Sequence, residues 1–340
     1  MNFKGKSVLV TGGAGTVGQE LVRQLLPRVK EIIIVDNNES EVFFMLEQFN
    51  GKIKGYVGDI SNRDFMYRVM CGIDIVFHTA ALKHVVLGER SPDSIVQTNV
   101  VGIQNVIDAA LDNNVERFIF TSSDKAVNPT NVMGTSKLLG ERLVTATNSK
   151  KRGQRTIFCS TRFGNVIGSR GSVFPIFKRQ IKAGGPITIT DERMTRFIMT
   201  IPEAVGLIIE AASIAEGGEV FVTKMPIMKI TDLAEVMREE LAPKYGYRPD
   251  DIAMKVIGSK PGEKLYEELM SLEEVDRSYE FDKFFCILPA FRSEYQTIEY
   301  TNTKNARKVT DPYISDEEHA QDTNYIRWYL KKNGLLGDTE

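Results

Sequence analysis

The order of hydrophobic and polar positions predicts strands that alternate with helices through the first half of the chain. Short runs rich in Val, Ile and Phe are separated by longer stretches with apolar residues at helical spacing. Nearly continuous apolar strands separated by helices are typical of a parallel sheet covered on both faces. The predicted fold class is therefore α/β, a Rossmann-type doubly wound parallel sheet. The predicted strands are 7–11, 31–36, 53–58, 73–78, 117–122 and 156–161, and predicted helices include 16–26, 94–113 and 132–147.

The pattern becomes irregular near residue 164, where short apolar pieces alternate with Gly, Pro and charged residues. We interpret 1–163 as the domain that carries the sheet. We interpret 164–340 as a smaller, mostly helical region that supplies loops at the sheet edge, with some segments able to return to the sheet. A last helix is predicted over 322–330, and the sequence shows no internal repeat.

Composition and charge narrow the function classes. The formal net charge is -2, so no general attraction to nucleic acid or to an anionic membrane is expected. Cys71, Cys159 and Cys286 are odd in number and far apart, which indicates reduced thiols, and no Cys-x-x-Cys pair suggests a metal site. The opening residues and the absence of a long apolar stretch predict no signal peptide and no membrane span. We expect a soluble, cytoplasmic protein.

A glycine-rich turn follows the first predicted strand and precedes a predicted helix. Glycines at 13, 15 and 18 fit the dinucleotide fingerprint, and Gly12 allows a wider spacing as well. Small residues are needed there because the backbone must turn tightly and approach a pyrophosphate at a helix N-terminus. The candidate cofactor-binding residues of this turn are Gly12, Gly15, Thr16, Val17 and Gly18.

The second predicted strand ends at Asp36, where a carboxylate can accept hydrogen bonds from the adenosine ribose and would repel a 2′-phosphate. The following Asn37 is another candidate contact. No arginine lies nearby that could bind a 2′-phosphate. We therefore favour NAD over NADP. The alternative is an ordinary glycine-rich turn with a surface aspartate.

Further candidates follow the next strands, at the edge where ligands of such sheets bind. Asp59 could hydrogen-bond adenine, although an ordinary turn aspartate fits equally well. Small residues after the fourth strand would let the backbone lie against the cofactor, and Lys83 is a candidate contact to phosphate or ribose. The remaining candidate cofactor-binding residues are Ile60, Ala80, Ala81 and Asn99.

A hydroxyl, an acid and an amine arrive together after the fifth predicted strand, in Ser123, Asp124 and Lys125. Downstream, Met133 and Lys137 are four residues apart, so on a helix they share one face. The alternative is a solvated turn pair and a methionine that belongs to the core.

These residues give the chain a resemblance to the extended short-chain dehydrogenase/reductase family. That family normally has a tyrosine where this chain has Met133. Within it, the chain resembles the UDP-N-acetylglucosamine 4,6-dehydratases, including a subgroup with methionine at that position. The motifs that carry this resemblance lie at 123–129, 131–134, 162–166, 169–173 and 261–264.

The resemblance implies an NAD-dependent nucleotide-sugar dehydratase whose cofactor stays bound and is recycled. Oxidation at C4 acidifies the C5 proton, a base removes that proton, and an acid protonates the departing C6 hydroxyl. We expect Asp124 to be the acid and Lys125 the base, with the lysine pKa lowered by burial and by nearby positive charge. Lys137 should bind the nicotinamide ribose. Methionine cannot accept the C4 hydroxyl proton, so Lys125, Asp124 or Ser123 must do so, directly or through water.

The region 164–340 should then hold the UDP-sugar, since a diphosphate needs cations and backbone donors. The resemblance also implies the N-acetyl group and a homo-oligomer formed through helices beside the sheet. Two other functions stay open: a nucleotide-sugar 4-epimerase, and an NAD-sensing regulator without catalysis. Stereochemistry at C5 is not determined by the sequence. The candidate substrate contacts are Lys83, Asn165, Arg170, Ser172, Arg196 and Glu263.

Overall fold

The computed structural model describes residues 2–150, 154–169, 172–259, 262–291 and 298–337. The chain forms two compact units, each with its own internal contacts. The first comprises Met1–Phe163, Ala204–Lys224 and Leu269–Pro312, and the second comprises Gly164–Glu203, Met225–Glu268 and Tyr313–Glu340. Two segments from the second half of the chain therefore belong to the same unit as the first 163 residues.

The first unit is built on one sheet, which has ten strands among the described residues. Neighbouring strands are parallel from β3 to β10, and the strands beyond β10 are antiparallel. Because the chain visits the parallel strands in the order of a Rossmann sheet, their carboxyl ends meet at one edge. In order across the sheet the strands are β3 (Lys54–Val57), β2 (Glu31–Asp36), β1 (Ser7–Thr11), β4 (Ile75–His78), β5 (Arg117–Thr121), β6 (Ile157–Arg162), β10 (Val220–Thr223), β15 (Phe284–Ile287), β14 (Ser278–Glu280) and β16 (Arg307–Lys308).

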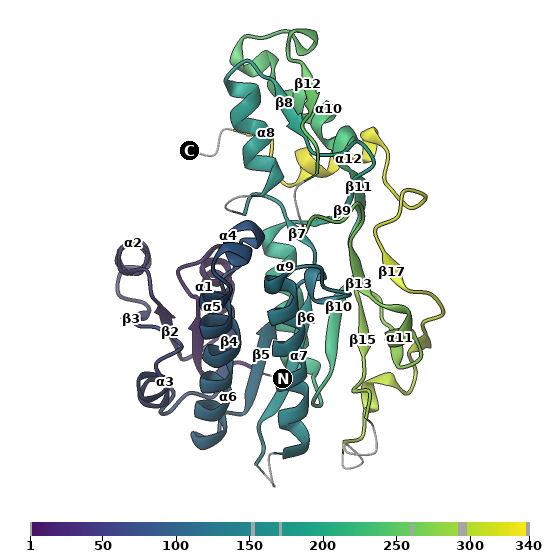
Figure 1. Ribbon diagram of the computed structural model, residues 1–340. Coiled ribbons are helices and arrows are strands. Elements are labelled where there is room, and N and C mark those ends of the chain that lie inside the picture. The colour runs from purple at the N-terminus through teal and green to yellow at the C-terminus, as the bar shows by residue number, and fades with distance from the viewer. Residues whose placement is uncertain (1, 151–153, 170–171, 260–261, 292–297, 338–340) are drawn as a thin grey trace. The chain divides into compact units, whose positions relative to one another are not determined.

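Helices cover this sheet, and Figure 1 shows α6 and α7 lying over one face of the strands. An apolar core on that face joins strand residues such as Leu9 and Phe118 to helix residues such as Met66, Val106 and Val144. The central strands β1 and β4 are buried along their whole length, whereas the edge strand β3 is mostly exposed. The helices and turns of this unit are α1 (Thr16–Leu25), α2 (Glu39–Gln48), α3 (Arg63–Val69), α4 (Val85–Arg90), α5 (Pro92–Ile95), the π-helix η1 (Val96–Gly102), α6 (Ile103–Asp112), the 3-10 turn η2 (Asp124–Ala126), α7 (Val132–Lys150), most of α9 (Ile201–Ile214) and α11 (Leu272–Val275).

The second unit combines three helices with small sheets within the described residues. Side chains from α8, α10 and α12, including Phe177, Leu233 and Leu330, pack into its own apolar core. One sheet has the order β11-β9-β7 and another pairs β12 with β8. Its elements are β7 (Asn165–Val166), α8 (Val173–Lys182), β8 (Ile187–Ile189), β9 (Thr195–Met199), β11 (Ile227–Lys229), α10 (Ile230–Leu241), β12 (Met254–Val256), β17 (Tyr313–Ile314) and α12 (Thr323–Lys332).

The α/β fold class predicted from the hydrophobic pattern is confirmed, and most predicted strands agree with the structure to within two residues. The predicted helix over 94–113 is confirmed as a helical stretch, in which α5, the π-helix η1 and α6 follow one another without a break. Within the π-helix, the Asn99 amide is bonded to the backbone of Leu82, and Gly102 lies against Ile60. Such π-helical turns often occur at functional sites.

Candidate active site

The glycine-rich turn brings the ends of β1 and β4 into contact. Gly12 has a φ of +68°, and a Cβ atom there would lie 2.6 Å from the backbone nitrogen of Ala80. A Cβ at Gly18 would lie 2.4 Å from the Gly12 carbonyl oxygen. Both positions therefore require glycine. Helix α1 begins at Thr16 after the exposed Gly15, and no side chain caps it, so its first amides remain available to an anion.

Asp36 joins the end of β2 to this turn. Its Oδ2 accepts a hydrogen bond from the Ala14 amide at 3.2 Å, and its Oδ1 accepts one from the Asn38 amide at 3.1 Å. The half-buried carboxylate thus stands beside the glycine-rich turn, as the sequence suggested. Next to it, Asn37 hydrogen-bonds Asp59; burial opposes ionisation of Asp59, yet hydrogen bonds from Ser61 and Asn37 lower its pKa. The uncapped start of α1 offers amides to a pyrophosphate and the two carboxylates offer acceptors to a ribose, so these residues fit a dinucleotide.

The segment after β4 is anchored from the π-helix. The Asn99 amide nitrogen donates to the Leu82 carbonyl oxygen and to Ser136 Oγ, both at 2.9 Å, and its oxygen accepts from the Leu82 amide. Ser136 in turn donates to the carbonyl oxygen of Met133. Asn99 therefore ties the segment of Ala80, Ala81 and Lys83 to helix α7. Within that segment Lys83 is exposed.

Lys137 is buried at the sheet edge with one close acceptor. Its Nζ donates to the Thr121 carbonyl oxygen at 2.9 Å and lies 4.8 Å from the centre of the Phe120 ring. Burial lowers its pKa to about 8, against the opposing effect of Glu141. Nearby, His78 is buried, shares a hydrogen bond of 2.8 Å with Thr11 Oγ1, and has its pKa lowered to about 3 by burial and by the Lys137 charge. The imidazole is therefore neutral at physiological pH.

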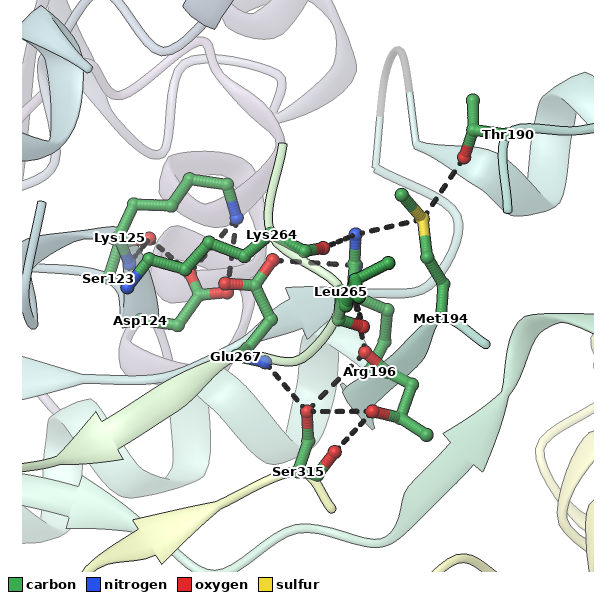
Figure 2. A network of polar contacts seen from close by, with 11 residues as sticks. Ser123, Asp124, Lys125, Thr190, Met194, Arg196, Lys264, Leu265, Glu267 and Ser315 are labelled. Carbon is green, nitrogen blue, oxygen red and sulfur yellow. Dashed lines mark hydrogen bonds and ion pairs between the residues drawn. The ribbon is translucent and has the colours of Figure 1, made fainter. Parts of the chain in front are cut away.

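Ser123, Asp124 and Lys125 form a compact acid–amine cluster directly after β5 (Figure 2). The Asp124 side chain is only 1% exposed, and its amide donates to the carbonyl oxygen of Phe163 at 3.2 Å. Ser123 Oγ donates to Asp124 Oδ1 at 2.5 Å. Lys125 Nζ reaches both carboxylate oxygens, at 3.2 Å and 3.0 Å. An acid and a base are thus held side by side, with the lysine side chain 28% exposed.

Helix α7 packs closely against this cluster because residue 134 has no side chain. A Cβ at Gly134 would lie 2.2 Å from the Lys125 carbonyl oxygen. The Gly134 amide donates to Asn131 Oδ1 at 2.8 Å, which fixes the start of the helix. Met133 is 3% exposed and offers no ionisable group at the position where the resembling family has tyrosine.

The second unit carries the predicted substrate contacts. Asn165 on β7 pairs with Ile198 of β9, the strand that also holds Arg196. Ser172 precedes α8, and its buried Oγ has no hydrogen-bond partner among the described residues. Glu263 is exposed. Arg170 lies outside the described residues.

The Arg196 guanidinium is already engaged in the second unit. It donates to the carbonyl oxygens of Lys264 at 2.9 Å and Leu265 at 3.1 Å, and its Nε lies 3.4 Å from Glu267 Oε1 (Figure 2). Arg196 therefore holds the segment that follows Glu263, and the structure brings these two predicted residues close in this way.

Sequence reasoning missed His78 and the buried partners of Arg162. The signal for His78 was available, since it is a polar residue that ends an apolar strand at the ligand edge. Arg162 belongs to a recognised motif, but its partners Glu141 and Glu274 are distant in sequence and looked like surface residues. Among the described residues, no group of His, Cys, Asp and Glu is placed to hold a metal ion. The described helices also include none with both the length and the apolar character to cross a membrane.

Known proteins resemble this chain over most of its length. The model of the polysaccharide biosynthesis protein family matches residues 8–289. An uncharacterized membrane protein of Methanocaldococcus jannaschii is 51% identical over 289 residues, which cover 84% of this chain and 87% of the relative. A UDP-N-acetylglucosamine 4,6-dehydratase (inverting) of Campylobacter jejuni is 38% identical over 323 residues, 92% of this chain and 93% of the relative.

A solved structure is also similar to this chain over nearly its whole length. Pen from Bacillus thuringiensis superposes with a TM-score of 0.91 at 41% identity, covering 99% of this chain and 100% of that one. Chains of three Rickettsia species that are 38% identical over 291 residues are named UDP-glucose 4-epimerase. The chain belongs to the polysaccharide biosynthesis protein family, within the extended short-chain dehydrogenase/reductases.

Proposed function

We propose that this protein is an NAD-dependent 4,6-dehydratase that converts UDP-N-acetylglucosamine into a UDP-4-keto-6-deoxy-N-acetylhexosamine for glycan biosynthesis. The observation that carries the proposal is the buried Asp124 carboxylate, held between Ser123 and Lys125 where β5 ends. Water elimination across C5 and C6 needs an acid and a base side by side, and this pair supplies both. The identity to the Campylobacter jejuni dehydratase supports the same reaction.

The glycine-rich turn and Asp36 would hold the cofactor. When bound there, NAD would supply the oxidation at C4 and the reduction at C6, so the protein would need no external reductant. Asp36 favours NAD over NADP, because its carboxylate would repel a 2′-phosphate. Lys137 would bind the nicotinamide ribose through its buried ammonium group. We propose that the cofactor stays tightly bound, since it ends each turnover in its starting state.

The acid–base pair accounts for every proton of the reaction. Asp124 accepts the C4 hydroxyl proton, directly or through Ser123, and then delivers that proton to the departing C6 hydroxyl, which leaves as water. Neutral Lys125 removes the C5 proton and returns it to C5 when the hydride arrives at C6. Asp124 ends ionised and Lys125 neutral, as they began. The methionine at 133 is then no obstacle, because the carboxylate replaces the tyrosine as the C4 base.

This scheme requires Lys125 to lose its proton before turnover. The contact of 3.0 Å to Asp124 favours the charged lysine, since an opposite charge stabilises the ammonium form. We therefore expect kcat to rise with pH as Lys125 becomes neutral. A rate that is independent of pH over the range in which lysines titrate would contradict this role.

The second unit would bind the UDP moiety. Ser172 Oγ lacks a partner among the described residues and lies at the start of the ten-residue helix α8, where backbone amides favour a phosphate. Asn165 and Arg170 are further candidates for the diphosphate or the sugar, Lys83 of the first unit for a phosphate, and Glu263 for the uridine ribose. Arg196 would act by holding the Lys264 and Leu265 backbone next to Glu263.

Self-association is a further proposal for the first unit. Exposed apolar side chains occur on α4, η1 and α7, and α7 contacts both α4 and η1. A second copy covering them would remove that surface from water. Sedimentation of the purified protein tests this, and a monomer at all concentrations would contradict it. The side chains are Val86, Leu87, Val96, Val101 and Leu139.

Two substitutions test the proposed roles. Lys125→Ala should abolish turnover and the incorporation of solvent deuterium at C5, while substrate still reduces the bound cofactor. Asp124→Asn keeps the shape of the side chain but cannot accept a proton, so it should block cofactor reduction as well. Both variants should retain NAD. Normal turnover by Lys125→Ala would refute the assignment.

The Rickettsia relatives make a 4-epimerase the second candidate. An epimerase also oxidises C4 but eliminates no water, so it has no need for an acid–base pair at C5 and C6. A product of unchanged mass with inverted C4 would establish it. Tight NAD binding without turnover of any nucleotide sugar would instead indicate a regulator.

A further inference from the structure

A buried ion cluster lies beneath the candidate active site in the first unit. Arg162, the last residue of β6, is 1% exposed and lies between two glutamates. Glu141 accepts from Nε at 3.0 Å and from Nη2 at 2.6 Å, and Glu274 accepts from Nη1 at 3.0 Å and from Nη2 at 3.1 Å. The Leu269 carbonyl oxygen accepts from Nη1 at 2.7 Å. All five guanidinium N–H groups are therefore used.

Glu274 is held in its ionised form. Burial alone would raise the pKa of Glu274, but the Arg162 charge and its hydrogen bonds lower that pKa to about 2. A second cation lies beside the three charged side chains, because Arg277 Nη2 is 3.8 Å from Glu274 Oε1. Removing three charges from water is costly, and a well-packed apolar cluster is often as stable. Such a cluster is better explained by the geometry that it imposes than by added stability.

The position of Arg162 affects the acid–base pair because the next residue in the chain is hydrogen-bonded to Asp124. Phe163 follows Arg162, and its carbonyl oxygen accepts the amide of Asp124. Clamping Arg162 therefore fixes the backbone on which the Asp124 carboxylate is mounted.

The same cluster is also connected to Lys137, the proposed cofactor contact, through helix α7. Glu141 lies four residues after Lys137, on the same face of the helix. Lys137 in turn donates to the Thr121 carbonyl oxygen at the end of β5. Arg162 thus joins the strand that supports Asp124 to the helix that carries Lys137.

We propose that Arg162, held by Glu141 and Glu274, is a positioning residue that fixes the spacing between the Asp124–Lys125 pair and Lys137. Its catalytic consequence rests on the proposed dehydratase function. Glu274 comes from the returning segment Leu269–Pro312, so the site is completed only when that segment joins the first unit. Ser271 supports Glu274, because its amide and hydroxyl both donate to Glu274 Oε2.

Loss of the cluster should change the balance between oxidation at C4 and elimination at C5 and C6. If the spacing loosens, hydride transfer at C4 and proton transfer at C5 and C6 lose their common geometry. Reduced cofactor should then accumulate on the enzyme during turnover, because elimination lags behind oxidation. A role in stability alone would lower the active fraction and leave that balance unchanged.

The test compares Glu274→Gln with a matched control, Glu219→Gln. Glu219 is also buried in the first unit, but its carboxylate accepts the amides of Glu216 and Gly217 instead of the Arg162 guanidinium. Hydrogen exchange of peptides over 122–126 reports the Asp124 amide, and absorbance reports reduced cofactor during turnover. We expect Glu274→Gln to speed that exchange by about tenfold or more and to accumulate reduced cofactor, with Glu219→Gln like wild type.

Unchanged exchange and cofactor balance in Glu274→Gln, or equal changes in both variants, would overturn the proposal. If Glu274→Gln does not fold, Ser271→Ala removes the hydroxyl donor to Glu274 together with the side-chain cap of α11, keeps the Glu274 carboxylate, and should give a smaller change of the same kind. If wild-type protein does not act on UDP-N-acetylglucosamine, the proposed function fails, and the exchange measurement still decides whether the cluster positions Asp124.

Discussion

Replacing Lys137 by methionine should make the cofactor-free protein more stable and weaken its binding of NAD. The Lys137 ammonium is buried with the Thr121 carbonyl oxygen as its acceptor, and burial lowers its pKa from 10.5 to about 8. Since each unit of pKa difference corresponds to about 1.4 kcal/mol, the charged lysine costs the folded state about 3 kcal/mol at pH 7. Loss of the hydrogen bond would offset about 1 kcal/mol of the gain. We expect Lys137→Met to raise the free energy of unfolding by about 2 kcal/mol.

The pH dependence gives the sharper test. Between pH 8 and 10.5 the unfolded lysine holds its proton while the folded one has lost it, so wild-type stability rises with pH relative to the variant. The advantage of Lys137→Met should therefore be largest at pH 7 and vanish near pH 10, where the cost of the charged lysine equals the roughly 1 kcal/mol of the lost hydrogen bond; at pH 10.5 the variant should be no more stable than wild type. Urea unfolding followed by circular dichroism at both pH values measures this difference. A variant that is less stable at pH 7, or an advantage that is independent of pH, would refute the reasoning.

Two further substitutions in the first unit test its electrostatics and its glycine-rich turn. Burial raises the pKa of Glu219 from 4.5 to about 7. Between pH 4.5 and 7 the folded protein holds a proton on Glu219 that the unfolded chain has lost, so the Glu219 contribution to wild-type stability should fall by about 3 kcal/mol over this range. Glu219→Gln should lack this slope in urea unfolding, and an identical slope would contradict the assignment. Gly12→Ala should lower NAD affinity at least tenfold in a binding titration, about 1.4 kcal/mol or more, because its Cβ would meet Ala80 at a φ of +68°. Wild-type affinity in that variant would show that the turn tolerates a side chain.

The sheet and the cofactor turn could be predicted because their signals are local. Apolar strands such as 7–11 and 117–121 read directly from the sequence, and glycines between a strand and a helix mark a turn that only they can form. Ser123, Asp124 and Lys125 were found for the same reason, since the end of a parallel strand locates the ligand edge. Their contacts are likewise between immediate neighbours in the chain.

The sequence analysis allowed some segments of 164–340 to return to the sheet, but it could not predict which ones, nor the ion cluster, because both depend on pairings between distant residues. The strand Val220–Thr223 was not among the predicted strands, and nothing local indicates that it lies beside β6. Glu274 meets Arg162 across 112 residues. Charged residues are usually exposed, so composition argued against burial at both positions. The π-helix was missed because a helical pattern with one extra residue still resembles an ordinary helix.

Incubation of the purified protein with UDP-N-acetylglucosamine, without added reductant, tests the central claim most directly. Mass spectrometry and NMR would follow the product. The proposal requires a loss of one water and the signal of a hydrated 4-ketone, and the C5 coupling pattern would then give the stereochemistry. A product of unchanged mass with altered C4 configuration, or no product from protein that holds NAD, would contradict the proposal.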